Sequence, residues 1–334
     1  MRTSAHPALL RYVAALSFLC WAAATAAEKP HIAVVEKVAG AVAFYSEDGH
    51  QLACVKVGPF PHEAALSADL RSLYVSDNGV LWMTENSNGT NTVSVVDVSG
   101  MRKVKDISLG DYHRPHGIAE VPHSDDLLAT TERPFALVRI DPAAGRVTRV
   151  YDIKGKSPHM VIPDSSGARA FVSDTDSNSI AVVDLKSGNV QLIATGARPQ
   201  GAALSPDRGR LYVVNTSGNT ISIIDTRLLK VVGTINTGKG PGRVAITPDG
   251  KTLVYNLQFD PGVGFANVET GKQVAEVPLS GRPLSLTMTR DGKRAFAGIQ
   301  DQDKVCFISI SGRRIERILQ LPKGSGPDPS IPLD

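Results

Sequence analysis

The sequence has few aromatic residues, few cysteines and no strong excess of charge. Among 334 residues, Phe, Trp and Tyr together make up 5%, cysteine occurs three times, and the formal net charge is +3. Hydrophobic residues make up 42% and the mean hydropathy is −0.06. These values exclude a disordered tail and a polytopic membrane protein. The small net charge by itself does not indicate a nucleic-acid partner.

Several motifs of well-known enzymes are also missing. The chain contains no glycine-rich phosphate loop, no Gly-x-Ser-x-Gly nucleophile motif, no Cys-x-x-Cys-His motif and no His-Glu-x-x-His motif. These absences argue against covalent haem attachment and serine-type hydrolysis.

The N-terminal segment is typical of a secretory signal peptide. Arg2 and Arg11 precede a charge-free apolar stretch from Tyr12 to Ala24, and small residues follow it. The apolar stretch is shorter than the ~20 residues that a membrane-spanning helix needs, although an uncleaved anchor is the competing interpretation. We therefore expect cleavage after residues 1–27 and a periplasmic or secreted protein of residues 28–334, with no membrane span left.

A Gly-x-x-Pro step recurs along the rest of the chain. Its prolines, with two altered copies included, lie 41 to 54 residues apart at Pro61, Pro115, Pro158, Pro199, Pro241, Pro283 and Pro327. Each interval contains a turn, then a short β-branched strand, an alternating strand that ends in Asp, and a last strand. Four short strands per ~42 residues are typical of β-propeller blades.

The pattern predicts an all-β, seven-bladed propeller in a single domain over residues 28–334. Six intervals fit between Pro61 and Pro327. Residues 28–57 contain three strands without an innermost one, and residues 327–334 supply a single strand. Joined, these two segments make a seventh, split blade that closes the ring.

The strongest copies of the repeat resemble a known family. Leu211-Tyr212-Val213-Val214-Asn215 and Ile221-Ser222-Ile223-Ile224-Asp225, between Arg198-Pro199 and Gly238, are similar to the YVTN-type β-propeller repeat. The resemblance implies a seven-bladed, usually exported propeller in bacteria or archaea. It specifies the fold better than the activity, because such proteins differ in function.

Most of the repeated residues have a structural interpretation. The aspartates at corresponding strand ends are expected to accept turn amides; they are Asp97, Asp141, Asp184 and Asp225. Cys54 and Cys306 fall on strands of adjoining blades that are too far apart for the ~5.5 Å Cα separation of a disulfide. We expect two free thiols.

One slot departs from the repeat in a way that indicates a site. The slot follows the proline that begins each blade, on the innermost strand, and its occupants are His62, His116, His159, Gln200, Gly242, Leu284 and Asp328. Three histidines in consecutive blades predict a divalent transition-metal site, zinc-like, at one mouth of the central channel. Glu132 and Asp174 follow second strands and are candidate acid–base or orienting groups. The alternative is that the histidines line a wet channel.

Cations and a long loop are predicted at the same mouth. Arg114, Arg198 and Arg282 each precede a blade-entry proline. Together with Gln200 they suit a small anionic ligand or an acidic loop of a protein partner. The longest interval contains the extra loop Asn78 to Asn91, which carries Trp82, and two further residues that include His113. Both residues are candidate ligand contacts.

Three functions remain open at this point. The first is a binding or interaction propeller, which we expect to be monomeric. The second is a metal-dependent hydrolase or lyase, because Pro115-His116-Gly117-Ile118 is partly similar to virginiamycin B lyase-type propellers and lactonase propellers share the architecture. The third is nucleic-acid binding, against which the lack of a broad basic surface and of aromatic stacking residues argues.

Overall fold

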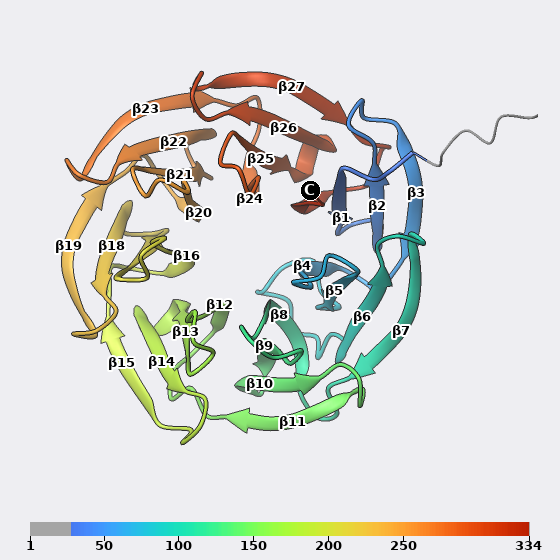
Figure 1. Cartoon of the computed structure of the whole chain (residues 1–334), viewed down its shortest axis with the longest axis horizontal. Coiled ribbons are helices and arrows are strands. Elements are labelled where there is room, and N and C mark those ends of the chain that lie inside the picture. Colours follow the sequence, from blue (N-terminus) through green and yellow to red (C-terminus); the bar gives the residue numbers. More distant parts are fainter. Residues whose placement is uncertain (1–27, 334) are drawn as a thin grey trace, which may run out of the picture.

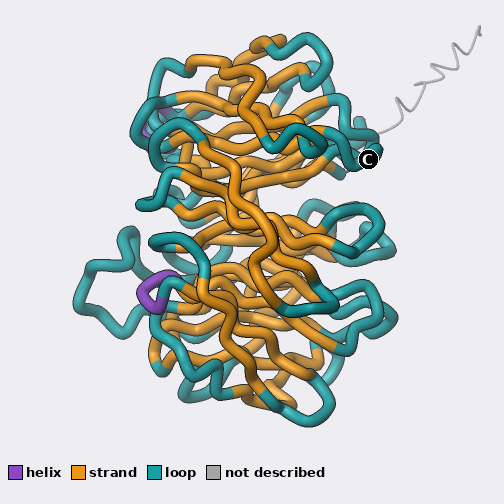
Figure 2. The backbone as a smooth tube through the Cα atoms, turned by 90° about the vertical axis from the view of Figure 1, so that its left-hand side faces the viewer, coloured by secondary structure: helices purple, strands orange, loops and turns teal. Residues whose placement is uncertain are grey.

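The seven-bladed propeller is confirmed. The computed structural model describes residues 28–333, so the predicted signal peptide lies outside the described residues. These residues form seven four-stranded sheets in which neighbouring strands are antiparallel, arranged around a central axis (Figure 1). Seen from the side, the strands occupy the middle of the molecule and the loops gather at its two ends (Figure 2).

Each blade contributes one strand to each of four concentric positions. The innermost strands are β4 (Pro61–Leu66), β8 (His113–Glu120), β12 (Pro158–Pro163), β16 (Pro199–Leu204), β20 (Pro241–Ile246), β24 (Pro283–Met288) and β28 (Pro327–Pro332). The second strands are β5 (Ser72–Asp77), β9 (Leu127–Arg133), β13 (Arg169–Asp174), β17 (Arg210–Asn215), β21 (Thr252–Leu257), β25 (Arg294–Ile299) and β1 (Ile32–Glu36).

The outer two positions complete the blades. The third strands are β6 (Thr92–Asp97), β10 (Phe135–Asp141), β14 (Ser179–Asp184), β18 (Thr220–Asp225), β22 (Gly262–Asn267), β26 (Lys304–Ser309) and β2 (Ala41–Tyr45). The outermost strands are β7 (Arg102–Ser108), β11 (Arg146–Tyr151), β15 (Val190–Ala194), β19 (Lys230–Asn236), β23 (Lys272–Pro278), β27 (Arg314–Gln320) and β3 (Gln51–Lys56). Two short 3-10 helices, η1 (Thr175–Ser177) and η2 (Gln300–Gln302), follow second strands.

The ring closes through the split blade, as the sequence predicts. Strand β28 pairs antiparallel with β1, with Ile32 opposite Pro332 and Val34 opposite Ser330. The sheet therefore joins the two ends of the described chain in the order β28-β1-β2-β3. Because backbone hydrogen bonds within this one blade join the N-terminal and C-terminal segments, the closed ring leaves no innermost or second strand unpaired.

The hydrophobic core lies between the blades. The described residues contain seven buried apolar clusters, one between each pair of neighbouring blades. Along β1, Ile32 and Val34 pack toward one neighbouring blade, whereas Ala33 and Val35 pack toward the other. Successive side chains of a strand point to opposite faces. An inner strand must therefore be apolar on both faces, and this explains the continuous valine and isoleucine runs.

The glycine of the Gly-x-x-Pro step is required for close packing. A Cβ atom on Gly155 would lie 1.2 Å from Asp174 Oδ2, and one on Gly58 would lie 2.3 Å from Asp77 Cγ. In both blades the glycine backbone covers the side chain that ends the second strand. In these two blades, only a residue without a side chain fits at this position.

Two further predictions about structural residues are confirmed. Asp184 Oδ1 accepts the backbone N–H groups of Lys186 and Ser187 at 3.0 and 2.6 Å, and the other strand-end aspartates accept turn amides in the same way. Cys54 is an exposed free thiol and Cys306 a buried one. Within residues 28–333, no helix has the length and apolar character needed to cross a membrane.

Candidate functional site

A cavity of about 250 Å³ lies at the end of the central channel where the innermost strands begin. We call it the entry cavity. Its lining includes six of the seven slot residues that the sequence singles out: His62, His116, His159, Gln200, Leu284 and Asp328. The propeller therefore brings together side chains that are up to 266 residues apart in the chain.

The rings of the three histidines lie against one another, the first pair stacked and the second pair tilted by 45°. The ring centroids of His62 and His116 are 3.9 Å apart, and those of His116 and His159 are 4.1 Å apart. Burial, followed by the proximity of His116, lowers the pKa of His62 to about 3 and that of His159 well below its ordinary value. Both rings are neutral at physiological pH, so they present one N–H donor and one acceptor nitrogen each.

Both ring nitrogens of His62 lie close to charged groups, but only Nε2 has a hydrogen-bond partner. Its Nδ1 lies 3.0 Å from Asp328 Oδ2, and its Nε2 lies 2.8 Å from Lys37 Nζ. An ammonium group can only donate, so Nε2 is the acceptor and the proton of His62 is on Nδ1, facing Asp328. Burial opposes ionisation of Asp328, but its contacts with His62 and Lys37 outweigh this effect and lower its pKa.

His116 is held in one orientation by a buried ion pair. Its Nδ1 lies 2.8 Å from Glu132 Oε1, and the other carboxylate oxygen of Glu132 lies 2.7 Å from the guanidinium of Arg114. Burial opposes ionisation of Glu132, yet the hydrogen bond from His116 and the charge of Arg114 lower its pKa. The buried Nε2 atom of His116 has no hydrogen-bond partner. Glu132 is thus an orienting group for His116, one of the two roles that the sequence suggests.

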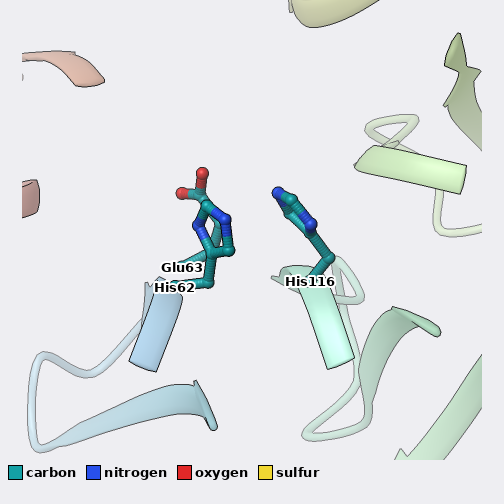
Figure 3. Close-up of side chains that lie close together, drawn as sticks. All are labelled: His62, Glu63 and His116. Carbon is teal, nitrogen blue, oxygen red and sulfur yellow. The ribbon is translucent and has the colours of Figure 1, made fainter. Parts of the chain in front are cut away.

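The group of possible metal ligands differs from the predicted histidine trio. Among the described residues, ligand atoms of His62, Glu63 and His116 lie within 4.8 Å of one another, and His159 is not part of that group. Figure 3 shows His62 and Glu63 projecting from one strand end and His116 from the neighbouring one. Glu63 is already paired, because its Oε1 lies 2.5 Å from the guanidinium of Arg243. This His/Glu cluster has the donor atoms to hold a metal ion.

The predicted rim cations have different surroundings. Arg282 lines the entry cavity and donates to Gln258 Oε1 at 2.9 Å. Arg198 is half-exposed and pairs with Asp176 at 2.6 Å. Arg114, predicted as a ligand contact at the mouth, is buried: only 2% of its side chain is exposed, and it donates to the carbonyl oxygens of two residues of the 78–91 loop.

The remaining candidate ligand contacts divide into two groups. Gln200 lines the cavity and accepts a hydrogen bond from Gln258 Nε2 at 3.2 Å. Trp82 also lines the cavity; the residue is 46% exposed, and its ring centroid lies 5.9 Å from Lys37 Nζ. The prediction that the long loop reaches this mouth is confirmed. His113, by contrast, lies on β8 opposite Arg133 of β9 and is not part of the lining.

Asp174 is buried beside the Gly155 loop and is not part of the cavity lining. Its carboxyl ends strand β13 and is covered by the backbone of that loop. Burial raises its pKa to about 6. In this place the carboxyl supports the loop. The structure does not bring it to the histidines, so the acid–base role suggested by the sequence has no geometric support.

We expect Asp174→Asn to raise the free energy of unfolding by about 2 kcal/mol at pH 7.5. The pKa is about 6 in the folded protein and near 3.8 in an unfolded chain. The folded state therefore binds the Asp174 proton more tightly than the unfolded chain does. The stabilisation that this proton gives is fully present below pH 4 and is lost as the pH rises to 6. Asn215 already occupies the same position beside Gly196. Urea unfolding at pH 4.5 and 7.5 checks this; a pH-independent difference between the two proteins would contradict it.

Sequence reasoning missed Glu63, which follows His62 on β4, and two further site residues, Lys37 and Gln258. The latter two each follow a second strand. At this position three other blades have a residue that donates to the carbonyl oxygen of the next blade's entry proline: Asn78, Thr175 and Thr216. Lys37 and Gln258 instead line the entry cavity. An alignment of the positions that directly follow the second strands would have shown that the split blade has a lysine where other blades have short polar residues.

Comparison with known sequences finds relatives over part of the chain. A segment of 137 residues is 31% identical to the uncharacterized protein YncE of Salmonella typhimurium and 27% identical to YncE of Escherichia coli. The aligned segment covers 39% of this chain and 38% of each relative, so the match spans well under half the length of these proteins. A search of protein-family models found no match.

Comparison with solved structures shows the fold. A protein of unknown function from Desulfotomaculum acetoxidans superposes with a TM-score of 0.77 at 15% identity, covering 91% of this chain and 99% of that one. Hydrazine synthase of Kuenenia stuttgartiensis gives a TM-score of 0.66 at 19% identity over 75% and 77% of the two chains. The dihydro-heme d1 dehydrogenase NirN in complex with DHE gives 0.66 at 15% identity over 91% and 67%.

Proposed function

We propose that this protein is a binding propeller that holds a small organic anion in the entry cavity. The observation that carries the proposal is the charge of the lining. Lys37, Arg243 and Arg282 line the cavity, whereas Asp328 is the one carboxylate among the described lining residues. Glu63 adds a second carboxylate next to Arg243, and the three cations still outnumber the two carboxylates. A cavity walled by protein strengthens the attraction of these cations for an anion.

The polar part of the lining consists mainly of hydrogen-bond donors. Arg282 donates to Gln258 and Gln258 donates to Gln200, so the chain of contacts ends at the amide group of Gln200 inside the cavity. A carboxylate is the natural ligand for a guanidinium and an amide N–H, because it can only accept hydrogen bonds.

The cavity also has an apolar side, formed by Leu81, Trp82, Met83 and Leu284. The ligand is therefore expected to combine a carboxylate with an apolar group that packs against the indole ring. The volume of about 250 Å³ is below the ~300–1,000 Å³ of pockets that take drug-sized ligands, which limits the ligand to a small molecule. On the basis of the predicted signal peptide, we place this binding function outside the cytoplasm.

We expect the protein to bind phenyllactate, and Arg282→Ala to weaken this binding by at least tenfold. The reason is the loss of the charge-assisted hydrogen bond to the ligand carboxylate. Isothermal titration calorimetry measures the affinity. Lys239→Ala is the matched control, because Lys239 is an exposed cation that pairs with Asp260 at 3.7 Å and is not part of the lining. Absence of binding of phenyllactate and of lactate to the unaltered protein would overturn the proposal.

A divalent transition metal is the second candidate ligand, and the free Nε2 of His116 favours it. Histidines that bind metals usually donate their other N–H to a carboxylate, as His116 does to Glu132. At the His62, Glu63 and His116 cluster, however, the ammonium of Lys37 and the guanidinium of Arg243 already occupy two of the three ligand side chains. Metal analysis of protein purified without a His tag separates the candidates: equimolar metal that is lost in His116→Ala would favour the metal.

A further inference from the structure

Two apolar residues are exposed directly beside residues of the entry cavity. Val38 is 45% exposed and Phe259 is 55% exposed, and each follows a lining residue, Lys37 or Gln258. Both lie two residues beyond the partner of a blade-entry proline. In three other blades the same position has an exposed polar residue: Asp176, Ser217 and Asp301. About half of each apolar residue faces water, where it contributes no burial energy to folding, so the pair indicates a surface that a partner covers.

Trp82 adds a third exposed apolar group at this end of the molecule. It lies on the 78–91 loop and is exposed although it lines the cavity. We call Val38, Trp82 and Phe259 the apolar arc. Their loops follow β1, β5 and β21, which belong to blades on one side of the ring, with only the blade of β25 between those of β1 and β21 (Figure 1). That blade contributes Leu284 to the cavity lining. The apolar side of the cavity is thus bordered by further apolar groups outside it.

Arg282 connects the cavity with this arc. Its side chain lines the cavity, and its guanidinium carbon lies 5.4 Å from the ring centroid of Phe259. One of its N–H groups donates to the neutral side chain of Gln258, and within residues 28–333 no carboxylate pairs with it. The guanidinium therefore has donors left for a carboxylate. An anion bound there lies next to an exposed aromatic ring.

We propose that the entry cavity binds the C-terminal residue of a polypeptide whose last residues are apolar, with the terminal carboxylate beside Arg282 and the preceding residues over the apolar arc. The inference rests on the proposed function, since the terminal carboxylate takes the place of the organic anion. The cavity volume of about 250 Å³ limits only the part of the ligand that lies inside. A free small acid leaves the arc in water, whereas a polypeptide fills the cavity and covers the arc.

The charge of the site favours a C-terminus over any other part of a polypeptide. The cations Lys37, Arg243 and Arg282 outnumber the carboxylates of Asp328 and Glu63. An N-terminal ammonium would add a further cation, and an internal segment with apolar side chains carries no charge. A terminal carboxylate offsets the excess, and its capture is a recurring mode of peptide recognition.

Isothermal titration calorimetry with short peptides tests the proposal. The probes are acetyl-Ala-Leu-Val-Phe with a free carboxylate, the same peptide as its C-terminal amide, and acetyl-Phe. We expect the free tetrapeptide to bind about tenfold more tightly than acetyl-Phe, because it also covers the apolar arc. We expect the same advantage over the amide, which cannot form a charged pair with Arg282. Equal affinities of the acid and the amide would show that the carboxylate is not recognised, and the proposal would be wrong.

Substitutions in the arc provide a second measurement. Phe259→Ser and Val38→Ser are each expected to weaken tetrapeptide binding by about threefold and to affect acetyl-Phe less, so that the ratio of the two affinities falls. Thermal unfolding checks that both variants remain folded. Leu228→Ser is the matched control, because Leu228 is an exposed apolar residue in the turn between β18 and β19, at the opposite end of the propeller. An unchanged ratio in both arc variants would contradict the inference.

The outcomes separate this inference from the proposed function. If phenyllactate binds but the tetrapeptide binds no more tightly than acetyl-Phe, the polypeptide proposal is wrong and the binding function stands. If phenyllactate, lactate and the peptides all fail to bind, the proposed function itself is wrong.

Discussion

Replacing Arg114 with alanine is expected to lower the free energy of unfolding by about 3 kcal/mol. Arg114 is buried, and its guanidinium pairs with Glu132 at 2.7 Å and donates to the carbonyl oxygens of Met83 and Glu85. Its removal leaves a buried carboxylate with one partner fewer and removes two hydrogen bonds to the 78–91 loop. Since domains are stable by only about 5–15 kcal/mol, the loss is large.

Arg198→Ala is a closely matched control for this prediction. Both arginines precede a blade-entry proline, and both have a backbone φ of 56°. Arg198, however, is half-exposed and its pair with Asp176 faces water, so its removal is expected to cost less than about 1 kcal/mol. Chemical denaturation of both variants measures the difference. Equal costs would show that the buried contacts of Arg114 do not stabilise the propeller.

Gly155→Ala is expected to destabilise the protein by about 3 kcal/mol, because overpacking in a closed core is costly. The new methyl group would lie 1.2 Å from Asp174 Oδ2 and 2.2 Å from its Cγ, and this carboxyl group is buried at the end of a second strand. Gly155 does not have a positive φ, so the effect is steric rather than a backbone preference. Thermal and urea unfolding measure it.

A double-mutant cycle tests the cause. The atoms closest to the new methyl group all belong to the Asp174 side chain, so Gly155→Ala should cost much less in an Asp174→Ala background. Gly233→Ala serves as the control on strand β19, since its Cβ would meet nothing closer than 3.4 Å, and it is expected to be neutral or slightly stabilising. An unchanged cost of Gly155→Ala in the double mutant would contradict the steric explanation.

The repeat determined how much of the fold was predictable. The spacing of the entry prolines placed every blade, and the unpaired segments at residues 28–57 and 327–334 predicted the closure seen between β1 and β28. A four-stranded sheet buries both of its faces when it packs between two neighbouring blades. Few folds other than a propeller therefore fit a repeat of about 42 residues with four strands. The histidine slot followed from the same register, because equivalent positions of successive blades converge on the axis.

Side-chain pairing across blades was not predictable in the same way. Arg114, Arg198 and Arg282 occupy the same position of the repeat, so the sequence predicts the same role for all three. In the structure, Arg114 is buried against Glu132, Arg198 is paired at the surface, and Arg282 lines the cavity. Their partners come from loops that differ between blades in length and composition. A periodic pattern contains no information about such differences.

The sequence alone thus determined the number of blades, the closure of the ring and the mouth at which the histidines gather. Only the tertiary structure decided what those histidines touch. Lys37 and Asp328 are nearly 300 residues apart in the chain and meet at His62 because the ring closes between them. Strand periodicity depends on neighbouring residues, whereas a buried ion pair depends on side chains that only the completed propeller brings within hydrogen-bonding distance.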